Sequence, residues 1–450
     1  MRDLVFIAFL LALFGFGLKR PFLFVLAYVY VDVVSPQRLT YYLLNSVPVS
    51  LIAVALAVLG WLIAEPKRDV RVAPRQVLIV VLLGYCWWTT RTADFPIEAA
   101  AKWAWAWKAL AFAAFLPLTL RTRLRIESLL LFMVLSAGSI IIVGGIKTLL
   151  SGGGYGQLHL MIDDNSGLYE SSIISCVAIA IVPVILWLAR HGTLFPPDWR
   201  VRCFAGALVF ACLLMPIGTS ARTGLLCIGL LALLLLRTAR RKLLLGGAMA
   251  ATVLAAVPLL PSSYTERMDT IRTYEGDASA STRLAVWRWT LDYVGDHPFG
   301  GGFAAYLQNR LSYDALKFRG EGGVEVVTAE REVDRARAYH SSYFEMLGEQ
   351  GWPGLTLWLL INFGGLVRME VLRRRHREGE FAWAGGLAEA LQGAHAIYLL
   401  GSLFVGIAFQ PFVYMLVGTQ IGLDTLLARR RAEEGCRPMR PPLPLRPAEA

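Results

Sequence analysis

The sequence predicts an all-α polytopic membrane protein, with about 12–13 transmembrane helices and one large helical loop on the outer side. Of its 450 residues, 56% are hydrophobic and 17% are charged, whereas soluble proteins usually carry about 25% charged residues. Apolar runs long enough to cross a hydrocarbon core of about 30 Å recur along almost the whole chain. The length alone would suit two or three soluble domains, but a soluble core could not bury so many apolar segments.

Apolar segments between charged or Pro/Gly breaks mark the expected membrane helices. Each must be helical in lipid, because an unsatisfied backbone amide costs several kcal/mol there. The first two are short and separated only by Lys19, Arg20 and Pro21. They form either two spans or a half-depth hairpin, which leaves the side of the N-terminus open. The expected helices are 3–18, 20–34, 45–64, 76–91, 101–119, 127–148, 170–190, 202–218, 222–237, 243–261, 340–367, 383–409 and 411–428.

Basic residues in the connections orient these helices. Lys and Arg are enriched in the cytoplasmic loops of membrane proteins, so the net charge of +11 reports topology and does not indicate nucleic-acid binding. The connections expected inside are 67–75, 121–125, 190–202, 237–242, 368–377 and 429–431. The segments expected outside are 92–100, 149–169, 219–222 and 262–339.

This alternation divides the chain into four parts. They are N-terminal transmembrane helices at 1–261, a large outer loop at 262–339, C-terminal transmembrane helices at 340–428 and a disordered cytoplasmic tail at 429–450. The Gly-rich outer segment 149–169 is too polar to span and is expected to dip back to the membrane surface. An amphipathic helix is expected at 281–295 within the large loop. The chain shows no internal repeat, which disfavours a transporter built from duplicated halves.

No motif for a metal or a cofactor stands out. The six cysteines are scattered, and none forms a CxxC pair, so neither a disulfide framework nor a zinc site is expected. Asp163 and Asp164 are the only acidic pair in a glycine-rich outer loop, which makes them a weak candidate for Mg²⁺. Walker, GxSxG and HExxH motifs are absent. We therefore expect neither a metal nor a nucleotide cofactor.

Arg222 is the first candidate for substrate binding. It lies in a tight turn of small residues, 218–224, between two expected spans at the outer side. An arginine there can simply extend to the membrane interface. Cations are disfavoured as anchors on the outer side, however, and small neighbours allow an anionic group to approach the guanidinium and the next helix start. A functional role is therefore favoured.

Two further arginines lie in the expected amphipathic helix. Arg283 and Trp287 are four residues apart and share a helix face, whereas Arg288 points elsewhere. The alternative is an interfacial helix whose Trp and Arg side chains face lipid headgroups. For Arg283 the two interpretations are balanced, and for Arg288 the interfacial one is favoured.

His340 marks the boundary between the large loop and the next span. It follows Tyr339 and precedes Glu345 by five residues. A lone histidine is usually structural, but this one shares its predicted side with Arg222 and Arg283. An imidazole there could hydrogen-bond a sugar hydroxyl, act as a base, or contact a phosphate when protonated. Glu345 could instead pair with nearby arginines.

Taken in order, these motifs resemble the O-antigen ligase and Wzy polymerase superfamily of bacterial surface-glycan enzymes, and the likeness covers nearly the whole chain. The matching motifs are Asp164-Asn165, the turn 219–224, the run from Arg283 to Trp287 and on to His-Pro-Phe-Gly-Gly-Gly at 297–302, and the run from His340 to Glu345 followed by Glu-Gln-Gly-Trp-Pro-Gly at 349–354. Segments 19–21 and 34–39 are also similar to the branch of exosortase-associated O-glycosylation ligases.

The resemblance implies a fold related to the membrane-embedded GT-C glycosyltransferases. It also implies transfer of a glycan from undecaprenyl pyrophosphate to lipid A-core, another glycan or a protein, at the periplasmic face of the inner membrane, without a metal. Arg222 and Arg283 would hold the donor pyrophosphate, and His340 would lie beside the reacting sugar and the acceptor. The weaker contacts to pyrophosphate or glycan would be Arg288, Asp164, Asn165, Glu345 and Tyr339.

The chemistry of such a transfer suits these residues. As the glycosidic bond breaks, negative charge builds on the leaving pyrophosphate, and preorganised arginines stabilise it. Attack by an acceptor hydroxyl on the opposite face predicts inversion in a single displacement. A ligase and a polymerase differ only in the acceptor, so the sequence does not separate them. A flippase or exporter of lipid-linked glycan would need charges deep within several spans, whereas these candidates gather at one face.

Overall fold

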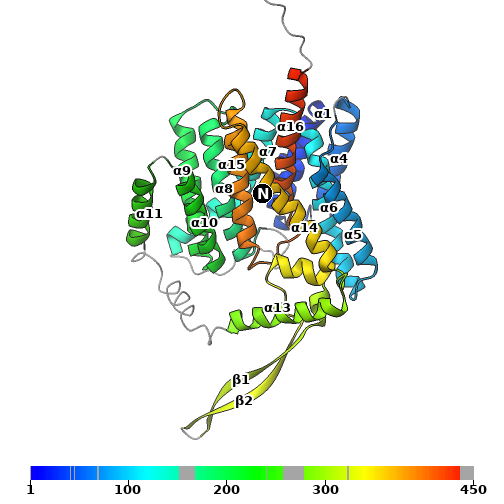
Figure 1. Cartoon of the computed structure of the whole chain (residues 1–450), viewed down its shortest axis with the longest axis vertical. Coiled ribbons are helices and arrows are strands. Elements are labelled where there is room, and N and C mark those ends of the chain that lie inside the picture. The colour runs from blue at the N-terminus through cyan, green and yellow to red at the C-terminus, as the bar shows by residue number, and fades with distance from the viewer. Residues whose placement is uncertain are drawn as a thin grey trace, which may run out of the picture.

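The computed structural model describes residues 2–435 apart from 41, 45, 68–69, 152–167, 240, 257–277 and 322–323. The long helices of this part form one bundle, and one further helix and a β-hairpin lie at one end of it (Figure 1). The bundle helices are α1 (Arg2–Lys19), α2 (Phe22–Val34), α4 (Val49–Ala64), α5 (Pro74–Arg91), α6 (Pro96–Thr119), α7 (Arg123–Ser151), α8 (Ser171–His191), α9 (Trp199–Gly218), α10 (Arg222–Thr238), α11 (Lys242–Ala256), α14 (Ser342–Arg375), α15 (Ala382–Gly401) and α16 (Pro411–Gly435).

These helices fall on the apolar segments that the sequence predicts. Among the described residues, five helices (α7, α8, α9, α14 and α16) are long and apolar enough to cross a membrane by length and composition, and α2 and α4 are shorter apolar helices. The other bundle helices pack alongside them, for example α6 against α16 and α15 against α8. The protein is therefore a multi-pass membrane protein of the all-α class, as predicted.

The basic connections meet at one end of the bundle, which we call the basic end. Each connection predicted to be cytoplasmic contacts another one. The contacts join Arg71 to the carbonyl of Ala428, Arg125 to Glu65 at 2.5 Å, Arg123 to the carbonyl of His191 at 2.6 Å, Arg237 to Glu370 at 3.0 Å, Arg429 to the carbonyl of Leu120 and Arg431 to His376. All six clusters thus lie on the same side, as a single cytoplasmic face requires.

The turn between α1 and α2 lies at this basic end as well. The Arg125 guanidinium packs over the ring of Phe22, 5.2 Å from its centroid, and Pro21 lies close to Gly60 near the end of α4. At about 1.5 Å per residue, α1 is about 27 Å long and α2 about 20 Å. Helix α1 therefore begins toward the opposite end, and Lys19 and Arg20 add to the basic charge.

The opposite end, which we call the insert end, carries the polar insert. Helix α13 (Ala278–Asp296) lies across the bundle there, and the strands β1 (Arg310–Glu321) and β2 (Val324–Arg335) extend away from it (Figure 1). The outer loop, predicted to be helical, is thus helical at α13 and a two-stranded antiparallel hairpin beyond it. Val-rich alternation in β2 suits a strand. Asn309 closes the base of the hairpin through two hydrogen bonds with the backbone of Arg337.

The helix predicted at 383–409 is shorter in the structure. Helix α15 ends at Gly401, and residues 402–410 form a non-helical segment within the bundle. Ser342 makes three hydrogen bonds to this segment. Its N–H donates to the backbone carbonyl of Ser402, and its hydroxyl donates to the backbone carbonyl of Val405. The same hydroxyl accepts a hydrogen bond from the N–H of Ile407. Irregular backbone is tolerated at membrane depth only where protein or a polar cavity satisfies it. The predicted helix was wrong here because the apolar run could not reveal these partners.

Candidate active site

A cavity of about 240 Å³ opens at the insert end, and we call it the outer cavity. It lies between the first turns of α6, the starts of α8 and α14, helix α13 and the 402–410 segment. Its lining includes four of the predicted site residues. The lining residues are Lys102, Glu170, Ser172, Ile173, Arg283, Tyr306, Ala338, Tyr339, His340, Glu345, Glu349, Phe404, Val405 and Gly406.

Trp287 explains how Arg283 reaches this cavity. Its indole N–H donates to the carbonyl of Tyr339 at 2.9 Å, and its ring stacks on Phe344 with centroids 4.8 Å apart and planes 5° apart. The two partners, Tyr339 and Phe344, flank His340 in the sequence, so these contacts hold α13 against the segment that carries His340. Arg283 lies one turn earlier on the same face as Trp287, so the guanidinium is directed into the cavity beside His340.

His340 has a backbone conformation that is uncommon for a side-chain-bearing residue. Its φ is 48°, in the left-handed region that non-glycine residues seldom occupy. Such conformations persist where the surroundings hold them, often at functional sites. Burial, and then the positive charge of Arg283, lower the pKa of His340, and Arg337 adds to the lowering while Glu170 opposes it. The imidazole is therefore held neutral at neutral pH, with one ring nitrogen able to accept a proton.

Tyr339 and Glu345 form the inner wall beside His340. Tyr339 is 3% exposed, and its hydroxyl is buried without a hydrogen-bond partner among the described residues. The carboxylate of Glu345 accepts a hydrogen bond from the N–H of Ala408 at 3.1 Å. Glu345 therefore holds the 402–410 segment in place as well as lining the cavity.

Lys102 is a cavity residue that the sequence reasoning missed. Its ammonium group, from the second turn of α6, contacts Glu345 at 2.6 Å and Glu349 at 2.7 Å. Glu349 also accepts a hydrogen bond from the N–H of Ala304 at 3.1 Å. A charged residue within a membrane helix is itself a signal of function. A lone lysine in the run Glu-Ala-Ala-Ala-Lys-Trp at 98–103 could therefore have been found.

The glycine-rich segment 298–302 fastens the insert to α14. Helix α14 is broken at Gly351, whose φ of 63° leaves carbonyl groups before it without helical partners. The N–H of Gly301 donates to the carbonyl of Gly348 at 3.1 Å, and the N–H of Gly302 donates to the backbone carbonyl of Glu349 at 2.9 Å. The N–H of Trp352 donates in return to the carbonyl of Pro298. The two motifs at 297–302 and 349–354 are therefore one joint.

The remaining predicted residues lie elsewhere or outside the described part. Arg222 begins α10 at the insert end, where the neighbouring Thr219 hydroxyl bonds that of Ser175 on α8 at 2.8 Å. Ser172 of the outer cavity lies one turn earlier on α8, so the turn of Arg222 packs next to the cavity, although Arg222 is not among its lining residues. Arg288 is exposed on α13 and does not line it either. Asp164 and Asn165 lie outside the described residues.

Comparison with known families agrees with these motifs. Residues 207–359 match the O-antigen ligase family, in a stretch that holds Arg222, Arg283, His340 and Glu345. Residues 1–193 match a family of unknown function, and they contribute Lys102 and the start of α8 to the cavity. No curated protein matches the chain. The resemblance to the O-antigen ligase superfamily is thereby confirmed over residues 207–359.

Proposed function

We propose that this chain, whose residues 207–359 match the O-antigen ligase family, transfers a glycan from undecaprenyl pyrophosphate to a hydroxyl acceptor. One observation carries the proposal: Arg283 and the neutral His340 share a single cavity at the end of an apolar bundle. Arginine suits a pyrophosphate because its planar donor fork matches phosphate oxygens. A neutral imidazole suits the hydroxyl that must lose a proton.

The proposed site faces the periplasm from the bacterial inner membrane. Support comes from the basic end, where the Lys- and Arg-rich connections gather, because such connections remain in the cytoplasm. The cavity lies at the insert end, on the far side of the bundle. A polyprenyl tail could then stay in the lipid while its pyrophosphate reaches the outer interface.

The reaction is a single displacement that needs no metal ion in this proposal. The acceptor oxygen attacks the anomeric carbon from the face opposite the leaving group, and its proton passes to a ring nitrogen of His340. The bond between that carbon and the pyrophosphate oxygen breaks, and its electron pair stays on the pyrophosphate. Arg283, with Arg222 from the neighbouring turn, stabilises this charge. The configuration at the anomeric carbon is inverted, and His340 returns its proton to solvent.

A matched pair of variants on α13 tests the role of Arg283. Arg283→Gln should lower donor turnover in proteoliposomes by about 100-fold, the usual effect of removing one donor that stabilises a developing charge. Arg288→Gln removes the same charge from an exposed position five residues away and should leave turnover close to wild type. Equal rates for the two variants, with both correctly folded, would exclude Arg283 from the donor site.

The acceptor is a separate question. In this family of reactions, a ligase passes the glycan to lipid A-core, a polymerase to a second lipid-linked glycan, and a protein O-glycosylation ligase to a protein hydroxyl. We favour the ligase, and incubation of lipid-linked glycan with and without a lipid A-core acceptor tests it. Product that forms only when lipid A-core is present supports a ligase. Longer lipid-linked glycans that form in the absence of lipid A-core support a polymerase.

A flippase for lipid-linked glycan is the second candidate, because some charges lie deeper than the sequence suggested. Lys102 and Lys108 both lie within α6, and Asp32 lies within α2. Such charges are what a polar path through the bundle would need. Proteoliposomes loaded with a fluorescent lipid-linked glycan separate the two functions, since a flippase exposes the lipid to an external quencher without cleaving its pyrophosphate bond.

A further inference from the structure

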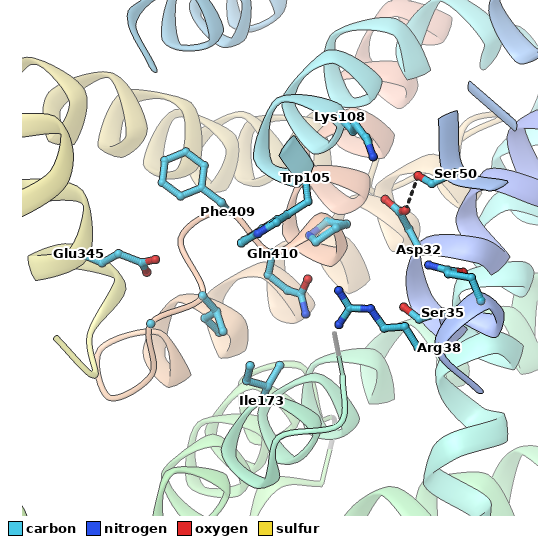
Figure 2. Close-up of a pocket in the computed structure, with 14 residues that line it drawn as sticks. Asp32, Ser35, Arg38, Ser50, Trp105, Lys108, Ile173, Glu345, Phe409 and Gln410 are labelled. Atoms are coloured by element: carbon cyan, nitrogen blue, oxygen red, sulfur yellow. Dashed lines mark hydrogen bonds between the residues drawn. The ribbon is translucent and has the colours of Figure 1, made fainter. Parts of the chain in front are cut away.

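A second cavity of about 170 Å³ adjoins the first one, and we call it the inner cavity. The two share Ile173, Glu345 and Gly406 in their linings, so they are neighbours. Figure 2 shows Asp32, Arg38 and Lys108 on one side of the inner cavity, Glu345 and Phe409 on the other, and Trp105 and Gln410 between them. Most of this lining comes from the first 193 residues, outside the O-antigen ligase domain.

Helix α6 supplies one wall to both cavities. Lys102 lines the outer cavity, while Trp105 and Lys108 line the inner one. Residues three apart lie on one side of a helix and are about 4.5 Å apart along its axis. The polar wall thus continues inward from the His340 region to a depth of about 18 Å from the start of α6 at Pro96.

The side chains of the inner cavity are of mixed charge. Asp32 is a carboxylate whose Oδ1 accepts a hydrogen bond from the Ser50 hydroxyl at 3.0 Å, and Glu345 is a second one. Arg38 and Lys108 are cations. Charged residues are rare at membrane depth and mark substrate pathways when they line a cavity. A lipid tail would not suit such a lining, because burying these groups against hydrocarbon is costly.

The side chain of Gln37 further restricts the kind of molecule that can occupy the inner cavity. The side-chain carbonyl oxygen of Gln37 is buried and has no hydrogen-bond partner among the described residues. It requires a donor, which the ionised pyrophosphate diester of a lipid-linked glycan does not offer. Asp32 and Glu345 likewise accept hydrogen bonds, whereas Arg38 and Lys108 donate them. A sugar ring fits both sets of groups, because each hydroxyl donates and accepts, and its C–H face can pack on the indole of Trp105.

We infer that the inner cavity is a subsite for one sugar ring of the glycan substrate, next to the ring that reacts at His340. The inference rests on the proposed transferase function and assigns Asp32, Gln37, Arg38, Trp105 and Lys108 to sugar recognition. The ring belongs either to the donor glycan or to the acceptor glycan. These two sources share the same chemistry, and the arms of the experiment separate them.

Protection of a cysteine inside the cavity tests occupancy without relying on activity. Ser35 lines the inner cavity, and Ser35→Cys is introduced into a chain whose exposed Cys203 has been replaced by serine, with Cys436 replaced as well. A small thiol reagent is applied to protein in nanodiscs. The additions are lipid-linked glycan, acceptor glycan, or undecaprenyl pyrophosphate without sugars.

We expect one of the two glycans to slow labelling by about fivefold or more, and the sugar-free lipid to leave it unchanged. Protection by the lipid-linked glycan assigns the subsite to the donor, and protection by the acceptor assigns it to the acceptor. Equal protection by the sugar-free lipid would overturn the inference, because the cavity would then hold the pyrophosphate. Absence of protection by either glycan, in protein that still performs transfer, would also overturn it.

A kinetic variant provides an independent readout. Gln37→Met keeps the length of the side chain but removes its hydrogen-bonding groups, so the KM for the protected substrate should rise about three- to tenfold. The kcat should change less. Gln392→Met removes a half-buried glutamine on α15, outside the inner cavity, and is the matched control. If the wild type performs no transfer, the proposed function is wrong. The labelling result still shows whether a glycan occupies the inner cavity.

Discussion

At the scale of single residues, Lys102 shows how two acidic side chains are kept beside the proposed site. Glu349 has a fully buried side chain and that of Glu345 is 8% exposed, and both contact the Lys102 ammonium group. The rings of Phe303 and Phe409 lie within 6 Å of the same nitrogen. Two carboxylates so close together in an apolar wall depend on the cation between them.

Removal of this cation should therefore destabilise the fold. Lys102→Met should lower the free energy of unfolding by about 3 kcal/mol, because it leaves buried carboxylates unpaired. Unfolding in mixed detergent micelles measures it. Lys67→Met is the control, since Lys67 bonds backbone carbonyls and packs over the Trp61 ring at the exposed basic end, where it has no acidic partner among the described residues. Adding Glu349→Gln to Lys102→Met should restore part of the loss, and unchanged stability in the single variant would contradict the argument.

The pH dependence of transfer depends on His340. The reaction needs the neutral imidazole, so activity should fall as the pH drops through the pKa of His340, which lies below its ordinary value. Arg337 is one of the charges that lower this pKa. Arg337→Gln removes that charge and frees Asp334 from its ion pair, and both changes favour the imidazolium. The acid limb of the kcat/KM profile should therefore move to higher pH.

Arg335→Gln is the control for this pH shift, because Arg335 lies two residues away and is exposed on β2. It should leave the acid limb in place. An acid limb that stays fixed in Arg337→Gln, or that moves to lower pH, would show that His340 is not the titrating group.

The sequence predicts some residues of the outer cavity and misses others for a physical reason. Arg283, Tyr339, His340 and Glu345 belong to motifs within one stretch of the chain, and they do line one cavity. Lys102 lies 243 residues before Glu345, its partner. Only the packing of α6 against the far end of the chain brings that pair together, and hydropathy carries no information about such a contact.

At the scale of elements, the joint between the insert and α14 makes the site possible. The segment 298–302 fits between the kink at Gly351 and the turn that joins α5 to α6. The N–H of Asp94 in that turn donates to the carbonyl of Gly301 at 2.9 Å. The Asp94 carboxylate also accepts hydrogen bonds from Tyr293 of α13 and from Gln308. Helix α13 is thus held at its middle by Trp287 and at its C-terminal end by this joint.

Two glycines on the insert should respond to alanine with opposite signs. A methyl group at Gly301 would overlap the hydroxyl of Tyr293 and the carboxylate of Asp94, so Gly301→Ala should destabilise the protein by about 1–3 kcal/mol and slow transfer. Gly295 lies in α13 with no atom within 4 Å of an added methyl group. Gly295→Ala should stabilise it by about 0.5–1 kcal/mol. Thermal unfolding measures both, and equal shifts would contradict the close packing at Gly301.

Elements follow from the sequence where one physical rule decides them. Hydropathy located the bundle helices because lipid allows few other backbone conformations. It extended α15 through residues 402–409, where Ser342 and Glu345 satisfy an irregular backbone that hydropathy cannot distinguish from a helix. The hairpin was missed because strand alternation over twelve residues is a weak signal beside a charged loop.

At the scale of the whole molecule, two regions with different family matches build one site. The region up to residue 193 supplies α6, the start of α8 and most of the inner cavity. The O-antigen ligase region supplies Arg283 and His340. The segment 402–410, which follows both, lines the two cavities. A glycan that occupies both cavities would therefore be recognised mainly by the region up to residue 193 and transferred by residues of the O-antigen ligase region.

The distribution of charge also fixes how this molecule should sit in a membrane. Six basic connections bond one another at one end, and the insert lies at the other, so the positive-inside rule places Glu378 in the cytoplasm and Arg335 outside. Single cysteines at these exposed positions test this in a chain that lacks Cys203 and Cys436, because the other described cysteines are buried. A membrane-impermeant thiol reagent added to spheroplasts should label Arg335→Cys at once, but Glu378→Cys only after lysis. The reverse pattern would place the outer cavity in the cytoplasm, where a periplasmic acceptor could not reach it.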